Sequence, residues 1–303
     1  MGCPLKTDCR RRPSSFFILA VLAFCLVLLF LAVPVTHADY TASETLSSFG
    51  TLHQPAWPNS RQDPNTSSDS SAFYDCTQTA LVNAFVYLQE TYGTALVPSY
   101  KGNRFNAYPS MDAAAKTLNT GLYTDPGHYV PTTWTRKGFW LGSEHGGNTV
   151  ASGTYNYVSK TAGISTTYFY AETRGSSSWA ANAPDRAFGI GENPTEAFLY
   201  NGLALGDAVL INWNNASSNQ WHWLILTGIS FDPATGAGTI SWIDPQNPAK
   251  KPAYSAKISI NQDGTIGFHY STTGWYSGDV SIINALVFGP NQMPSMDSPV
   301  TLP

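Results

Sequence analysis

The sequence predicts an α+β fold in which an N-terminal helix packs on a C-terminal antiparallel β-sheet. Apolar residues recur at helical spacing over residues 76–92, whereas residues 208–288 contain six short apolar runs separated by turn residues. Helices and strands that are segregated along a chain are typical of α+β domains. With 303 residues, of which 43% are hydrophobic, the chain can also bury a core. We expect one such domain over residues 73–289.

The first 38 residues have the pattern of a secretory signal peptide. Lys6 and Arg10–Arg12 form a basic region, Phe16–Val33 is an uninterrupted apolar run, and Thr36 and Ala38 favour cleavage after residue 38. An apolar run of 18 residues is close to the roughly 20 that span a bilayer, so an uncleaved anchor is the alternative. We therefore expect a secreted protein, or a periplasmic or membrane-tethered one if the signal is retained.

Each element of the predicted domain follows from local signals. Asp75 or Ser71 can cap the first long helix, Gly93 can end it, and Pro194 suits the first turn of a later helix. The turn Gln262-Asp263-Gly264 predicts a hairpin. The expected helices cover 76–92, 111–118 and 194–205, and the expected strands cover 208–213, 223–229, 239–243, 256–260, 266–270 and 281–288. Residues 39–72 are expected to form an extended N-terminal arm, and residues 290–303 a Pro-rich flexible tail.

The cysteine content indicates a candidate for a catalytic thiol. Cys3, Cys9 and Cys25 lie in the predicted leader, so Cys76 is the one cysteine of the remaining chain. Exported proteins keep structural cysteines in pairs, so a single thiol is a buried bystander, an intermolecular partner or a nucleophile. At the start of a helix, the positive end of the dipole stabilises a thiolate. The free N–H groups there can also stabilise an oxyanion.

A nucleophilic thiol needs a base, and His222 is the best placed histidine. It directly precedes a strongly apolar strand, and Asp244 ends the next strand of the same predicted hairpin. Because adjacent antiparallel strands place the first residue of one beside the last residue of the other, these two side chains should meet. The carboxylate would then orient the imidazole. The predicted catalytic residues are Cys76, His222 and Asp244, although Asp244-Pro245 alone could be a turn starter.

This order of residues resembles that of papain-like cysteine peptidases. The matching segments are Asp75-Cys76-Thr77-Gln78-Thr79-Ala80, Ala204-Leu205-Gly206-Asp207-Ala208-Val209, His222-Trp223-Leu224-Ile225-Leu226-Thr227-Gly228 and Trp242-Ile243-Asp244-Pro245. The chain is most similar to the bacterial immunoglobulin-G-degrading cysteine endopeptidases, the Mac family. It departs from them at Thr77, where relatives commonly carry Gly, and at Gln246, where they carry an acidic residue.

The resemblance implies a papain-like fold and a secreted endopeptidase that works through an acyl-enzyme. It also implies a side-chain oxyanion donor upstream of the nucleophile, for which Gln62 is chosen over Gln54 and Gln78 because of its spacing from Trp57. The expected substrate is a protein or peptide, with immunoglobulin G as the named candidate. We expect a monomer without membrane contact in its mature form.

Composition narrows the classes of partner and cofactor that the protein is expected to bind. The net charge of −4 offers no basic excess for nucleic acid, and no Cys and His spacing suits a metal, so we expect neither nucleic-acid partner nor cofactor. Two alternatives to a peptidase stay open. One is a secreted binding or adhesion module with a vestigial triad, and the other is a transpeptidase or transglutaminase.

Overall fold

The computed structural model describes residues 39–53, 75–98, 100, 108–118, 154–155, 157–158, 164, 167–173, 187–190, 192–215, 217, 220–249, 253–272 and 276–300. The chain divides into two units between Ala38 and Asp39, and all described residues belong to the second. The predicted signal peptide and the predicted oxyanion donor Gln62 therefore lie outside the described residues.

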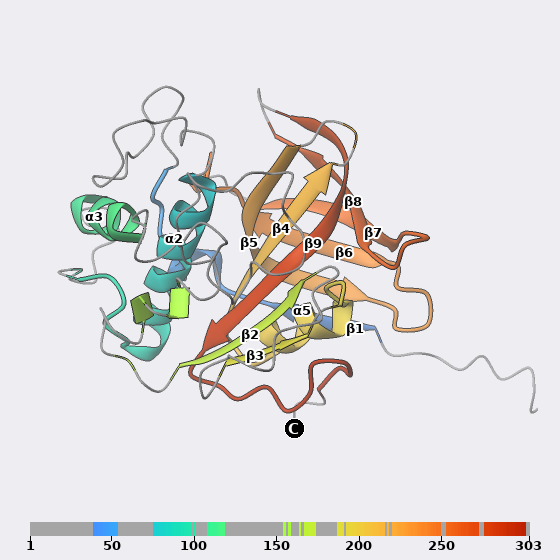
Figure 1. Cartoon of the computed structure of the whole chain (residues 1–303), viewed down its shortest axis with the longest axis horizontal. Coiled ribbons are helices and arrows are strands. Elements are labelled where there is room, and N and C mark those ends of the chain that lie inside the picture. Colours follow the sequence, from blue (N-terminus) through green and yellow to red (C-terminus); the bar gives the residue numbers. More distant parts are fainter. Residues whose placement is uncertain are drawn as a thin grey trace, which may run out of the picture. The chain divides into compact units, whose positions relative to one another are not determined.

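Six antiparallel strands close into a β-barrel (Figure 1). They are β4 (Ala208–Asn215), β5 (Gln220–Phe231), β6 (Gly238–Ile243), β7 (Tyr254–Ile260), β8 (Ile266–Ser271) and β9 (Ser277–Gly289). Each pairs with the next, and β4 pairs with both β5 and β9, which closes the ring. Three further strands extend the barrel wall. β1 (Tyr40–Ser43) joins β5, β2 (Tyr168–Thr173) joins β9, and β3 (Ala187–Ile190) runs parallel to β2.

Helices pack on the outside of this barrel. α2 (Asp75–Tyr92) lies against β4 and β5, and α3 (Tyr108–Leu118) packs on α2. α5 (Glu196–Ala204) contacts β1, β4, β5 and β9, and a short 3-10 helix, η1 (Leu46–Ser48), touches α2. α2 ends at Gly93, whose φ of 70° lies in the left-handed region that glycine favours. Of the helices in the described part of the chain, none is long and apolar enough to cross a membrane.

The predicted α+β papain-like fold is wrong, because the sheet is not an open layer but a closed barrel. Strands hold 39% of the structure and helices 26%. The closing pair joins Val209 to Val287 and Leu210 to Leu286, residues that are far apart in sequence. Local hydrophobic patterns predict where a strand lies but not which distant strand it pairs with. β1, β2 and β3 were not predicted, and β1 lies within residues 39–72, which were expected to form an extended arm.

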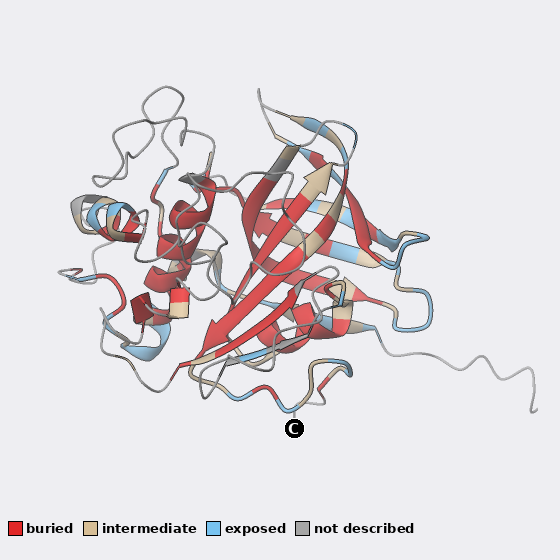
Figure 2. Cartoon of the chain, viewed as in Figure 1, coloured by how far each residue is buried: buried red, intermediate tan, exposed pale blue. Residues whose placement is uncertain are grey.

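Two apolar cores explain the continuous hydrophobic runs of the central strands. Along β4, Val209, Ile211 and Trp213 belong to a cluster that includes the barrel interior, whereas Ala208 and Leu210 belong to a cluster shared with α2. β4 is accordingly buried from Ala208 to Trp213, and α2 is buried from Cys76 to Leu88 (Figure 2). A strand that is buried on both faces loses the alternation of polar and apolar residues.

Residues 290–300, expected to form a flexible tail, instead pack against α5. The Nδ2 of Asn201 donates to the carbonyl oxygens of Ser295 and Ser298 at 2.8 and 2.9 Å, and its Oδ1 accepts from the backbone N–H of Val300 at 2.8 Å. Asn201 is itself fully buried. The side-chain amide of Asn201 thus holds the segment at three residues. The polar composition of the segment did not predict this anchor.

Candidate active site

Cys76 is the second residue of α2 and a free thiol with 1% of its surface exposed. Its position in the first turn agrees with the predicted helix start to within one residue. The backbone N–H groups of a first helical turn have no partner within the helix, so they are available to an anionic group near the thiol.

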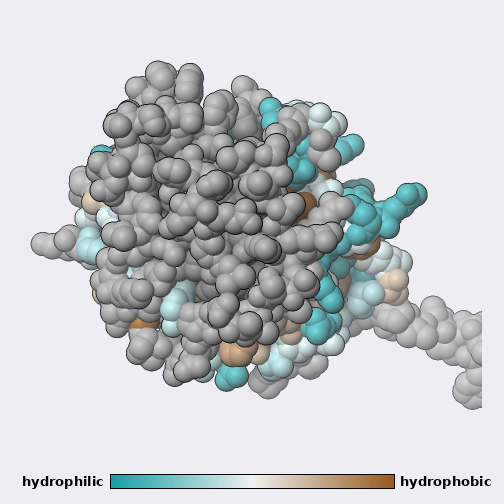
Figure 3. Space-filling model, viewed as in Figure 1, coloured by the Kyte–Doolittle hydropathy of each residue, from teal (hydrophilic) through white to brown (hydrophobic). Residues whose placement is uncertain are grey.

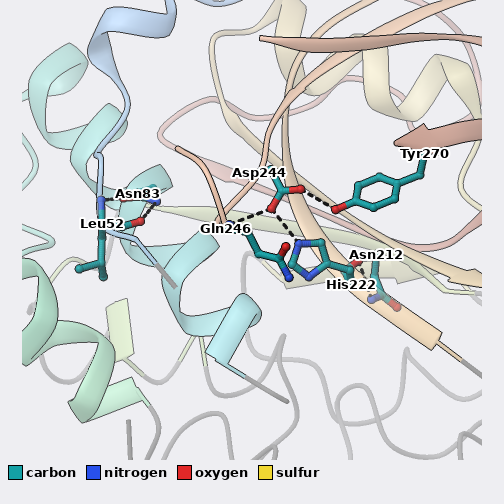
Figure 4. Close-up of polar contacts among 7 residues, drawn as sticks. All are labelled: Leu52, Asn83, Asn212, His222, Asp244, Gln246 and Tyr270. Atoms are coloured by element: carbon teal, nitrogen blue, oxygen red, sulfur yellow. Dashed lines mark hydrogen bonds and ion pairs between the residues drawn. The ribbon is translucent and has the colours of Figure 1, made fainter. Parts of the chain in front are cut away.

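A buried amide anchors α2 to the preceding chain. Asn83 accepts a hydrogen bond from the backbone N–H of Leu52 at 2.7 Å and donates one to its carbonyl at 2.9 Å (Figure 4). Gly50 adds a backbone bond to the Asn83 carbonyl at 3.0 Å, and an added Cβ on Gly50 would lie 2.7 Å from Asn83 Oδ1. This close contact fixes the position of the helix that carries Cys76.

His222 and Asp244 meet as the hairpin argument predicted. His222 Nε2 lies 3.0 Å from Asp244 Oδ1, and the exposed fractions of the two residues are 1% and 0% (Figure 4). His222 is the third residue of β5, opposite Trp213 of β4, and Asp244 directly follows β6. The predicted pairing of these two side chains is confirmed.

Three donors hold the Asp244 carboxylate. Oδ1 accepts from His222 and from the backbone N–H of Gln246 at 2.8 Å, and Oδ2 accepts from the Tyr270 hydroxyl at 2.5 Å (Figure 4). Sequence reasoning missed Tyr270, because this residue lies on β8 and no local signal relates that strand to Asp244.

The electrostatics favour a charged pair. Burial alone would lower the pKa of His222, but the Asp244 carboxylate and the Cys76 side chain outweigh it and raise that pKa. Burial would likewise raise the pKa of Asp244, yet the imidazolium, together with the Tyr270 and Gln246 hydrogen bonds, lowers it. Imidazolium and carboxylate are therefore the stable forms at neutral pH.

Cys76 completes the arrangement, because a hydrogen bond between the His222 ring and the Cys76 sulfur contributes to the raised pKa of His222. Since Nε2 of the ring faces Asp244, Nδ1 is the nitrogen available to the thiol. The structure thus brings together all three predicted catalytic residues, Cys76 from α2, His222 from β5 and Asp244 from the end of β6.

Two surrounding features fix the imidazole. The backbone carbonyl of His222 accepts a hydrogen bond from Asn212 Nδ2 at 3.1 Å. Asn284 Nδ2 in turn donates to Asn212 Oδ1 at 2.9 Å, and all three residues are buried. The Trp213 ring packs edge-on to His222 with 6.1 Å between centroids. Two tryptophans, Trp221 and Trp223, flank His222 in the sequence. Trp223, however, is buried in the cluster shared with α2, and the side chain of Trp221 lies outside what the structure describes.

The position of Trp213 opposite His222 could have been predicted by counting residues across the predicted hairpin. Trp213 is the last residue of one predicted strand, and the polar loop that follows ends just before His222. Asn212 could be found in the same way. Asn284 could not, because it belongs to the distant strand β9.

The oxyanion donor remains a prediction. Gln62 and Gln54 lie outside the described residues, and Gln78 is buried within α2. Among the residues that the structure describes, no group of three His, Cys, Asp or Glu side chains could hold a metal ion.

A second histidine–carboxylate pair, His269 and Asp279, lines a cavity of about 630 Å³ together with other residues of β4, β7, β8 and β9. His269 Nδ1 is 2.8 Å from Asp279 Oδ1, and Ser277 Oγ is 3.3 Å from Nε2. The described surface over β7 and β8 is hydrophilic (Figure 3). With side chains 60% and 93% exposed, this pair is screened by water, unlike His222 and Asp244.

No protein-family model matches the chain, and no curated protein matches its sequence.

Proposed function

We propose that the protein is a secreted cysteine endopeptidase that hydrolyses peptide bonds through Cys76, His222 and Asp244. One observation carries this proposal: a single buried imidazole lies between a free thiol at a helix start and a buried carboxylate. This arrangement supplies a nucleophile, an acid–base group and an orienting group in one connected unit.

The proposed reaction follows from these roles. The Cys76 thiolate attacks the peptide carbonyl carbon, and N–H groups of the first turn of α2 stabilise the oxyanion. His222 gives a proton to the leaving amine as the C–N bond breaks, which leaves an acyl group on sulfur. Neutral His222 then takes a proton from water, whose oxygen attacks the thioester and releases the acid and the thiolate.

The free-energy cost of burying the charged His222 and Asp244 side chains supports a catalytic role over a vestigial one. Burying an ion pair carries a desolvation penalty that apolar residues of similar size would avoid. Perturbed pKa values cluster at functional sites, and here both His222 and Asp244 are perturbed by a specific partner. A binding module would gain nothing from this arrangement.

The substrate is proposed to be a protein segment, with immunoglobulin G as the narrower candidate. Cys76 and His222 are each 1% exposed, so substrate binding has to open the entrance to the thiol. A transpeptidase would use the same acyl-enzyme with an amine in place of water, and no described feature favours it over hydrolysis.

The test compares Cys76→Ala and His222→Ala with His269→Ala, a matched change at an exposed histidine, in the full chain. We expect the first two variants to lose cleavage of denatured casein and the third to keep it. Added EDTA should leave the rate unchanged. Immunoglobulin G, incubated in parallel, distinguishes a narrow target from general proteolysis. Turnover that survives in Cys76→Ala would refute the nucleophile.

A further inference from the structure

The Tyr270 hydroxyl has no place in the reaction described above, yet it binds the carboxylate at its centre. It donates to Asp244 Oδ2 at 2.5 Å, and both residues are fully buried. The other carboxylate oxygen is occupied by His222 and by the Gln246 N–H. Without Tyr270, Oδ2 would have no hydrogen-bond donor among the residues that the structure describes.

The Tyr270 ring is itself held in place by barrel side chains. Its centroid lies 4.7 Å from that of Trp213 and 6.2 Å from that of Trp242. Burial and the adjacent carboxylate raise the pKa of Tyr270, so the hydroxyl keeps its proton and stays a donor. A rigid ring with a permanent donor can fix both the plane and the ionisation of the carboxylate.

We propose that Tyr270 is a positioning residue that keeps Asp244 ionised and aligned with His222, and so extends the catalytic unit to four side chains. The inference rests on the proposed function. Its consequence is a pH dependence: when Oδ2 loses its donor, the carboxylate is less stabilised and becomes protonated at higher pH. The imidazolium then loses its partner, so the acid limb of activity moves upward.

The titratable groups that face this unit come from four elements. Asp244 is faced by His222 of β5 and Tyr270 of β8, His222 is faced by Cys76 of α2, and Tyr270 also by Tyr254 of β7. Among these side chains, Asp244 is the one carboxyl group. A shifted acid limb in a Tyr270 variant can therefore be assigned to Asp244.

The experiment compares Tyr270→Phe with Tyr170→Phe in the full chain. Tyr170 is also buried and its hydroxyl accepts from Met293 N at 2.8 Å, but it lies on β2, away from the carboxylate. The first readout is the rate at which iodoacetamide alkylates Cys76 from pH 4 to 9, followed by mass spectrometry of its peptide. The second is kcat/KM for casein.

We expect Tyr270→Phe to lower kcat/KM about ten- to a hundredfold, the range for a lost hydrogen bond to a charged group. Its acid limb should move up by about one pH unit. Tyr170→Phe should leave the limb in place even if it lowers stability. In an Asp244→Asn background, Tyr270→Phe should cost about fivefold at most, because the hydrogen bond that it removes there joins two neutral groups.

Incorporation of 3-fluorotyrosine at position 270 tests the idea without removing the ring, should Tyr270→Phe fail to fold. The more acidic hydroxyl is a stronger donor, so the acid limb should move to lower pH. An unchanged limb in both Tyr270 variants, or an equal effect of Tyr270→Phe in the Asp244→Asn background, would overturn the proposal. Failure of the proposed function itself would look different, because Cys76→Ala would then retain casein cleavage.

Discussion

Replacing Asp244 with Asn removes the negative charge of the site but keeps an oxygen acceptor. The amide oxygen can occupy the Oδ1 position and accept from both His222 and the Gln246 N–H. The amide nitrogen then faces the Tyr270 hydroxyl, which can turn and accept instead of donating. The reverse orientation would set NH₂ against two N–H donors, so one orientation is preferred.

The size of the effect follows from these three bonds. A hydrogen bond to a charged acceptor contributes about 1.5–3 kcal/mol, and one between neutral groups about 1 kcal/mol. The His222 bond therefore loses about 0.5–2 kcal/mol, which corresponds to roughly a two- to thirtyfold decrease in rate. We expect Asp244→Asn to retain measurable activity, in contrast to His222→Ala.

Asp244→Ala provides the contrast, because it leaves the donors of His222, Gln246 and Tyr270 without their acceptor in the interior. At about 1–3 kcal/mol for each buried unsatisfied group, we expect at least about 3 kcal/mol of lost stability. Urea denaturation measures that loss, and casein cleavage together with Cys76 alkylation measures the rates. If Asp244→Asn were as active as the unaltered protein from pH 5 to 8, the assigned role of the carboxylate would be refuted.

Two further changes test the fold around the site. Asn83→Ala should lower the free energy of unfolding, measured by urea denaturation, by about 3 kcal/mol, because both backbone groups of buried Leu52 lose their partner. The control Asn193→Ala, which removes an exposed hydrogen bond to Asp263, should lower it by less than about 1 kcal/mol. Equal losses would contradict the anchoring role of Asn83. Burial raises the pKa of Glu172 to about 9, so the folded chain holds a proton that the unfolded chain releases above its ordinary pKa near 4.5, and stability falls as pH rises between those values. Glu172→Gln should therefore be more stable than the unaltered protein by at least about 1 kcal/mol at pH 8 and similar to it at pH 5, and the same difference at both pH values would exclude this explanation.

The triad could be predicted from the sequence because its signals are local. The helix that carries Cys76 follows from apolar spacing and a terminal glycine, and the His222–Asp244 contact follows from two strands joined by one turn. The six central strands were each placed to within a few residues for the same reason. Neither inference requires knowledge of distant contacts.

What could not be predicted depends on pairing between distant segments. The β4–β9 ladder joins residues such as Ile211 and Ala285, and β2 extends the wall on the other side of β9. Asn201 fixes the C-terminal segment through contacts more than 90 residues away. A polar segment with several prolines has no local pattern that would reveal such an anchor.

The wrong prediction of the fold and the missed residue Tyr270 have one cause. Asp244 follows β6, and Tyr270 lies on β8, which is separated from β6 by β7. In a flat sheet, strands two positions apart are about 9–10 Å apart, too far for a short side chain and a ring hydroxyl on one face to bond easily. In a closed barrel the interior faces turn toward one another, so β5, the end of β6 and β8 can all supply groups to one carboxylate. The closed barrel, in place of the expected papain-like arrangement, thus allows the buried Asp244 carboxylate to accept from three donors.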